Sequence, residues 1–532
     1  MLDMLLMAES RFACQMVPSL PPLAWLAQVD VATGNTDLQH GRWLENGPDF
    51  VVEGVWDGDF SAGAFDQSAT VFGSGVVRHP DGPVFVPSCA NTDYLYYRHS
   101  GQQLLIANSL PLLLAACGDE LDPDCADYPA NTESIKKGID HYQAEIATRD
   151  GAVRRLIYRN LAVRNGQVLL LDKPGVGAFG SYEQYAAFMS ERCGALLANA
   201  RDRRRARPLR VLSTQSRGYD STAVNTVAAP FGIDQVFTIS DSKVKNAFAD
   251  YEAGDAQCDD GSDIAACLGI PCQSIARREY EALGSDEYLY FAGICNSEDL
   301  SFAGVVRHIE SPSVLLTGTH GELYYPSRDH RRVHPGVPIG SELRRGDLGG
   351  GHGLTEVRLQ RGFILLPLIY CGARERPSIV DVTESAAMDP WRLGGDYDRP
   401  IARRLAESAG VPRALFGQKK LATAAVLARP AVPRNAGLRR EFFDFLVERK
   451  LLQRWQLRCF PLVHRYNAML WFASPNYHRW LYYLGRVLLR LKRPLPKTRW
   501  RHLNGALYCY AVNRRAGEYR AALADKQVAG QR

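Results

Sequence analysis

The run V-L-S-T-Q-S-R-G-Y-D-S-T-A-V at residues 211–224 is the part of the sequence best suited to bind phosphate. An apolar stretch ends in it, Gly218 permits a sharp turn, and a helical pattern follows. Such a turn directs backbone N–H groups to one point, where the helix dipole adds positive charge. Hydroxyl groups for phosphate oxygens come from Ser216, Ser221 and Thr222. The carboxylate of Asp220 would repel phosphate unless Mg²⁺ lay between them, so the run predicts a pyrophosphate site with a metal ion.

The elements that position this run have the pattern of a parallel α/β sheet. Strand-like runs at 209–214, 234–240 and 313–318 are buried in character, and a helical pattern lies near 260–269. Buried strands that alternate with helices are typical of such a sheet. A longer helix is predicted to begin after Ser181, a suitable N-cap with Gln184 three residues later.

The flanking regions have other patterns. Residues 20–175 alternate short apolar runs with turn residues, as at 84–86, 104–109 and 168–172, which predicts a β-rich region of layered sheets. The basic run 201–207, followed by Pro208, is predicted to be a solvated helix end and domain boundary. The Gly-, Arg- and His-rich stretch 326–362 is predicted to be a loop or lid, and residues beyond 395 to be mainly helical.

Three motifs of the central region carry a resemblance to a known family. S-R-G-Y-D-S at 216–221 resembles the S-G-G-x-D-S signature of pyrophosphate-loop ATPases, with Arg217 in place of the first glycine. V-L-L-T-G-T-H-G-E-L at 314–323 is similar to V-L-L-x-G-x-G-x-D-E of asparagine synthetases, and 397–420 resembles their late helical region. The motifs span roughly residues 209–420 in the family's order, so the chain resembles the asparagine synthetases.

The resemblance implies ATP and Mg²⁺ as cofactors. The residues it assigns to nucleotide binding are Thr214, Ser216, Arg217, Gly218, Tyr219, Asp220, Ser221, Thr222, Ile239, Thr317 and Gly318. Its metal ligands are Asp220 and Glu322, and Leu323 departs from the acid that the family has next. The family lysine that stabilises charge on the adenylate is matched best by Lys419, with Lys420 as the next choice.

The position after Gly318 is also catalytic in the family. There the family has an acid, or a tyrosine in members that form β-lactams, and this chain has Thr319. Removing a proton from an amine would then need another base, for which His320 is the nearest titratable group. The alternative is that His320 is a solvated histidine in a turn.

The N-terminal region also resembles the family, but without its chemistry. Residues 92–114 are similar to part of the Ntn-hydrolase-like domain that hydrolyses glutamine with an N-terminal cysteine. Here Met1 is followed by Leu2, and the earliest cysteine, Cys14, is followed by Gln-Met-Val-Pro rather than Gly-Ile-x-Gly. We therefore expect a degenerate domain at 1–180, an ATP-binding pyrophosphate-loop domain at 181–425 and a helical, basic region at 426–532.

The sequence thus predicts an ATP-dependent ligase that activates a carboxylate as its adenylate and then forms an amide, without glutamine hydrolysis. The substrates would be a small-molecule or carrier-bound carboxylate and an amine. Two alternatives stay open: a nucleotide-binding pseudoenzyme, given the departures at Arg217, Thr319 and Leu323, and a thiolating or tRNA-modifying pyrophosphate-loop enzyme.

Composition limits the remaining classes. A net charge of +5 in 532 residues gives no reason to expect nucleic acid, and the scattered cysteines, with no C-x-x-C pair, favour reduced thiols. Without a long apolar run or a basic leader, a cytoplasmic protein is expected. The segment 476–493 has the pattern of a basic amphipathic helix, which either packs on the enzyme or meets an anionic membrane. A homodimer is a further expectation.

Overall fold

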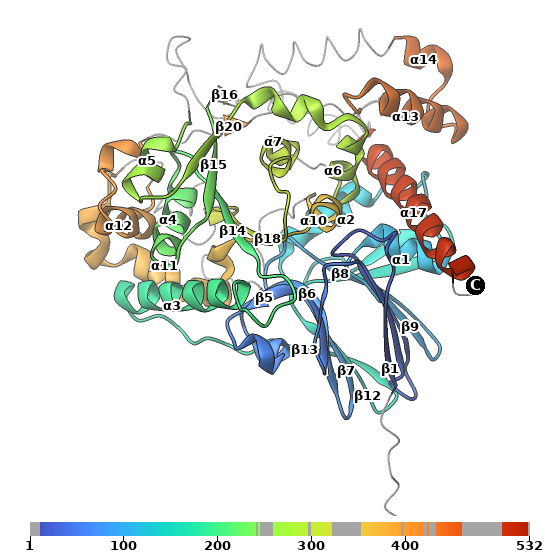
Figure 1. Cartoon of the computed structure of the whole chain (residues 1–532). Coiled ribbons are helices and arrows are strands. Elements are labelled where there is room, and N and C mark those ends of the chain that lie inside the picture. The colour runs from blue at the N-terminus through green and yellow to red at the C-terminus, as the bar shows by residue number, and fades with distance from the viewer. Residues whose placement is uncertain are drawn as a thin grey trace, which may run out of the picture.

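The computed structural model describes residues 11–240, 243–244, 259–295, 299–321, 353–394, 398–418, 423–424, 432–459 and 503–529. Two β-sheets come first, an all-parallel sheet with flanking helices follows, and the described C-terminal part is helical (Figure 1). This order confirms the predicted β-rich, α/β and helical regions. Within these ranges, no helix is both long and apolar enough to cross a membrane.

Two sheets form the N-terminal region. The seven strands of the first are, in spatial order, β1 (Phe12–Met16), β3 (Thr36–His40), β2 (Trp25–Asp30), β9 (Gln103–Ala107), β8 (Leu95–Ser100), β11 (Gly151–Leu156) and β10 (Glu145–Thr148). The six strands of the second are β13 (Gln167–Leu171), β12 (Asn160–Arg164), β7 (Gly82–Val86), β6 (Val71–His79), β5 (Phe50–Trp56) and β4 (Glu45–Asn46). The apolar runs that predicted strands at 84–86, 104–109 and 168–172 lie in β7, β9 and β13.

Alternate side chains of these strands form a core between the two sheets. Trp25 of β2 stacks on Phe85 of β7 with ring centroids 6.2 Å apart, and neither residue is exposed. Val76, Leu104 and Leu161 belong to the same buried cluster. The N-terminal region is therefore a two-layered sandwich with its own core.

The third sheet has five parallel strands in the order β17 (Cys272–Ile275), β15 (Gln235–Ile239), β14 (Arg210–Thr214), β18 (Ser313–Leu316) and β19 (Phe363–Leu366). A short antiparallel pair joins β16 (Lys243–Val244) to β20 (Thr423–Ala424). The α-helices of this part are α3 (Tyr182–Ala200), α4 (Tyr219–Ala228), α5 (Ser262–Cys267), α6 (Leu289–Ala292), α7 (Ala303–Val306), α10 (Thr355–Arg361), α11 (Arg376–Glu384) and α12 (Pro400–Ser408). The other α-helices are α1 (Leu110–Cys117) and α2 (Tyr128–Glu133) in the N-terminal region, and α13 (Ala436–Glu448), α14 (Arg454–Arg458) and α17 (Leu503–Ala529) in the C-terminal part.

Helix α3 begins where the sequence predicts. The Ser181 side chain caps it by accepting a hydrogen bond from the Gln184 amide at 3.2 Å. The basic run that follows is not wholly solvated, however. Arg205 is only 4 % exposed and donates to the carbonyl of Gly54 in β5 at 2.8 Å. The prediction of a solvated patch is therefore wrong at Arg205, because the second sheet lies against this turn.

Helix α10 corrects another prediction. The described end of the stretch 326–362, which its composition suggested is a loop or lid, contains this helix, and Glu356 and Arg358 on it are buried. Arg358 donates to the Glu53 carboxylate of β5 at 2.8 Å and to Asp93. All three side chains are at most 3 % exposed, so a buried ion cluster joins α10 to the N-terminal sandwich.

Helix α17, in the C-terminal part of the chain, also contacts α10. Glu356 of α10 accepts hydrogen bonds from Ser109, at the start of α1, at 2.6 Å and from Tyr519 of α17 at 2.8 Å. Arg515 of α17 donates to the same carboxylate at 3.2 Å. Figure 1 shows α17 beside α1, so the N-terminal region and the C-terminal helix α17 meet at α10.

Replacing Arg358 by Met should lower the free energy of unfolding by about 3–5 kcal/mol, because Glu53 and Asp93 would remain as buried charges without their cation. Chemical denaturation followed by circular dichroism measures this. The matched control is Arg361→Met on the same helix, whose side chain is 39 % exposed and pairs with Asp286 at 3.3 Å. That surface pair should contribute at most about 1 kcal/mol. Equal losses in the two variants would contradict the importance of the buried cluster.

Candidate functional site

The candidate site lies where the strand order of the parallel sheet reverses. From β14 the chain moves outward to β15 and β17, and then returns to the other side of β14 with β18 and β19. Ligands of open α/β sheets bind at the carboxyl ends of the strands beside such a switch point. The run 215–218 follows β14 and the run 317–321 follows β18, so both motifs border it.

The loop after β14 is held by its own hydroxyl groups. Ser216 N donates to Ser221 Oγ at 3.1 Å, and Gly218 N donates to Ser216 Oγ at 3.1 Å. Thr222 is fully buried and its hydroxyl donates to the Gly218 carbonyl at 2.7 Å. Thr222 thus shapes the loop from within, whereas the half-buried Ser216 is nearer the surface. Gly218 precedes α4 and has no side chain that could cap the helix N-terminus.

Arg217 stands where the resembling family has glycine, and its side chain lies away from the loop. Its backbone N–H donates to Asp259 at 2.9 Å, and its Nε donates to the Asp260 carbonyl at 2.9 Å. The guanidinium also approaches Asp263 of α5 at 3.4 Å and is 39 % exposed. The loop therefore accommodates the arginine without filling the space over α4.

The segment after β18 contacts the start of α4. A Cβ atom at Gly318 would lie 2.5 Å from the backbone carbonyl carbon of Asp220. One at Gly321 would lie 2.6 Å from the carboxyl carbon of the same residue. Only residues without a side chain fit here, so the predicted metal ligand Asp220 is packed directly against the second motif.

The remaining residues of the second motif differ in their surroundings. Thr317 is 1 % exposed, and its hydroxyl has no hydrogen-bond partner within the described ranges. Thr319 and His320 are half-buried. His320 adopts a left-handed φ of 61°, and its ring meets that of Tyr370 edge-on with centroids 6.4 Å apart. A non-glycine residue holds such a conformation only where its surroundings fix it.

Thr214 and Ile239, predicted to border the adenine, end β14 and β15 and are both half-buried. The Thr214 carbonyl accepts a hydrogen bond from Asn225 at 3.0 Å. Between these strand ends, Thr238 accepts from the amide of Gly261 at 2.9 Å. The two predicted residues thus lie on neighbouring strands at the carboxyl edge of the sheet.

Glu322, Lys419 and Lys420 lie outside the described residues, so their roles stay predictions. The chain on both sides of Lys419 is placed, however. Gly417 N donates to the Arg217 carbonyl at 2.9 Å, and Thr423 of β20 pairs with Val244 of β16. The described residues on either side of the two lysines thus contact the phosphate loop at Gly417 and β16 at Thr423.

A buried amide network under the loop was not predicted. Asn225 of α4 donates to the Gln215 side chain at 2.7 Å, and Gln215 in turn donates to the Ser216 carbonyl at 2.7 Å. A polar Asn within the apolar helix 223–228 is the signal that could have indicated it. The contacts of Asp259 with Arg217 and of Tyr370 with His320 gave no such signal, because each pair is distant in sequence.

Cys14 lies in the middle of β1, paired in register with Leu38. Burial raises the pKa of its thiol to about 11, which leaves little thiolate near neutral pH. Cleavage before Cys14 would also remove the first residues of β1. Both facts argue against this cysteine as an N-terminal nucleophile.

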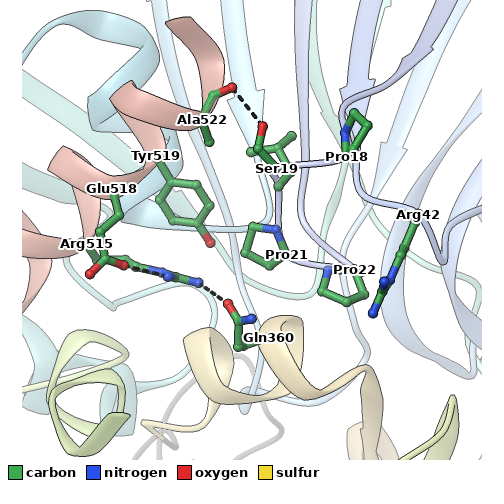
Figure 2. Close-up of a pocket in the computed structure, with 11 residues that line it drawn as sticks. Pro18, Ser19, Pro21, Pro22, Arg42, Gln360, Arg515, Glu518, Tyr519 and Ala522 are labelled. Atoms are coloured by element: carbon green, nitrogen blue, oxygen red, sulfur yellow. Dashed lines mark hydrogen bonds and ion pairs between the residues drawn. The ribbon is translucent and has the colours of Figure 1, made fainter. Parts of the chain in front are cut away.

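A cavity of about 280 Å³ lies apart from this site, where residues 18–22, α10 and α17 meet. Figure 2 shows Arg515 between Glu518 and Gln360, to which it donates at 2.8 and 2.9 Å. The Arg515 guanidinium is thus already paired within the wall of this cavity. Among the residues that the structure describes, the candidate site included, no group of three or more His, Cys, Asp or Glu side chains could hold a metal ion.

Comparison with known proteins found no protein-family model that matches the chain and no curated protein with significant similarity.

Gly318→Ala should lower the free energy of unfolding by about 1–3 kcal/mol, because the added methyl overlaps the backbone of α4. Calorimetric unfolding measures this. Gly517→Ala is the control, since a Cβ there meets no atom within 4 Å. In the interior of α17 that change should stabilise the chain by roughly 0.5–1 kcal/mol. A Gly318→Ala protein as stable as the parent would rule out the close contact.

Proposed function

We propose that the chain is an ATP-dependent carbon–nitrogen ligase that activates a carboxylate as its adenylate and then forms an amide. One observation carries the proposal: the S-R-G-Y-D-S loop and the segment 317–321 meet at the switch point of the sheet, with Gly318 and Gly321 against Asp220. Two motifs that were matched separately to the asparagine-synthetase-like family thus lie in contact. The finer fold that we propose is a pyrophosphate-loop synthetase domain after a degenerate Ntn-hydrolase-like domain.

The loop residues would bind the pyrophosphate portion of ATP. The positive end of α4, next to Gly218, would stabilise the charge that develops as pyrophosphate leaves. Asp220, together with Glu322, would hold Mg²⁺, which supplies positive charge between the carboxylates and the phosphate oxygens when bound. Thr214, Ile239 and Thr317 would border the adenosine portion.

The chemical step would proceed in two parts. A carboxylate oxygen of the substrate attacks the α-phosphorus, an acyl-adenylate forms, and pyrophosphate leaves. An amine then attacks the acyl carbon, AMP leaves, and the amine nitrogen loses a proton. Lys419 would stabilise negative charge in both parts, and His320 is the candidate base for that proton.

The source of the amine follows from the N-terminal region. With Cys14 inside β1 and its thiol pKa raised, Cys14 would not serve as a nucleophile for glutamine hydrolysis. The amine would therefore be free ammonia or part of a larger substrate. The sandwich would act as a scaffold, tied to the synthetase region through Arg358 and Glu53.

Asp220→Asn should reduce ATP-dependent pyrophosphate release to background, because the neutral amide cannot hold Mg²⁺ against phosphate. The assay uses a panel of carboxylates with ammonia and with simple amines. Asp381→Asn, an exposed position on α11, is the control and should keep full activity. Activity in Asp220→Asn equal to the parent would remove the metal role. A parent that binds ATP but releases no pyrophosphate with any carboxylate would favour the pseudoenzyme.

Lys419→Ala should lower turnover about 10²–10³-fold and change ATP affinity little, because its charge is needed mainly as negative charge develops. Steady-state turnover and equilibrium ATP binding separate the two effects. Lys420→Ala is the register control and should stay within a few-fold of the parent. The opposite result would move the role to Lys420, and two unaffected variants would contradict a lysine-assisted adenylation.

A further inference from the structure

Tyr219, the first residue of α4, is fully enclosed next to the phosphate loop. Its ring meets Phe416 edge-on with centroids 5.8 Å apart, and the guanidinium of Arg403 lies 5.0 Å from the ring centroid. The latter two residues come from α12 and the segment after it, and Figure 1 shows α12 beside α4. The start of α4 is thus packed against residues that come from a later part of the chain.

Arg403 adds polar contacts to this apolar packing. It is fully buried, donates to the Tyr219 hydroxyl, and lies 3.4 Å from the Gly417 carbonyl oxygen. Its other terminal nitrogen pairs with Glu407 at 3.3 Å. A buried guanidinium is stable only with such partners, so its position is fixed by all of them together.

Gly417 brings the backbone itself to the loop. Its N–H donates to the Arg217 carbonyl at 2.9 Å, and its φ is 63°. A Cβ at this position would lie 2.5 Å from Cε1 of Tyr219. Neither the backbone conformation nor the space suits a side chain, so the contact depends on glycine.

We infer that Arg403 is a positioning residue, and that with Tyr219 and Gly417 it forms a clamp that holds the phosphate loop and the segment 413–418 in one arrangement. The clamp fixes the carbonyl of Arg217 from one side and the ring of Tyr219 from the other. Between them lie Gly218 and the start of α4, whose positive end would face pyrophosphate. The inference rests on the proposed function only for the identity of that ligand.

The test compares alanine substitutions at Gly417 and Gly410, two glycines with positive φ. Gly417→Ala should push the segment off Tyr219, and hydrogen exchange of the amides at 216–222 and 413–418 should become at least tenfold faster. Gly410→Ala is the matched control, because its φ of 86° is equally unfavourable for alanine but no atom lies within 4 Å of the added Cβ. Its exchange at 216–222 should match the parent. Arg403→Met should likewise speed exchange at 216–222, since the Tyr219 hydroxyl loses its donor.

Binding of Mg²⁺-pyrophosphate, measured by calorimetry, gives a second readout. Gly417→Ala should bind at least tenfold more weakly than Gly410→Ala, and Arg403→Met should also bind more weakly than Gly410→Ala. Equal exchange rates and equal affinities in the two glycine variants would overturn the clamp. If the parent itself does not bind Mg²⁺-pyrophosphate, the proposed function fails, while the exchange rates still decide whether the clamp exists.

Discussion

The contact between the backbone after β18 and the first turn of α4 is the constraint on which the candidate site depends. Parallel pairing of β14 with β18, in which Ser213 lies opposite Leu316, brings the two strand ends level. Glycines at 318 and 321 then let the chains touch at Asp220, and Gly261 approaches Gln215 in the same way from another side. The two motifs thus meet at the switch point beside the start of α4, where the helix dipole favours an anion.

The rest of the chain keeps this contact in place. Arg358 and Glu356 of α10 anchor the helix to the sandwich and to α17 through buried charged groups. Because α10 leads directly into β19, and β19 pairs with β18, any shift of the sandwich would reach the second motif. Under the proposed function, the sandwich would serve as a scaffold for the synthetase region.

Local patterns explain what the sequence could predict. The strands β14, β15 and β18 and the Ser181 cap of α3 follow from apolar runs and nearby turn residues, and they placed both motifs at one sheet edge. Burial that depends on distant partners was not predictable. Arg358 meets Glu53 from 305 positions away, so α10 was mistaken for a loop. Arg403 is one of several arginines in a helical run, and only its contact with Tyr219, 184 positions away, distinguishes it.

The central claim is that a carboxylate is activated as an adenylate at the switch point. Carboxylate-dependent exchange of labelled pyrophosphate into ATP tests it most directly, because exchange requires that the first step be reversible and needs no amine. The account predicts exchange that depends on both Mg²⁺ and one class of carboxylate. Cleavage of ATP to ADP and phosphate, with no label entering ATP under any carboxylate, would contradict it.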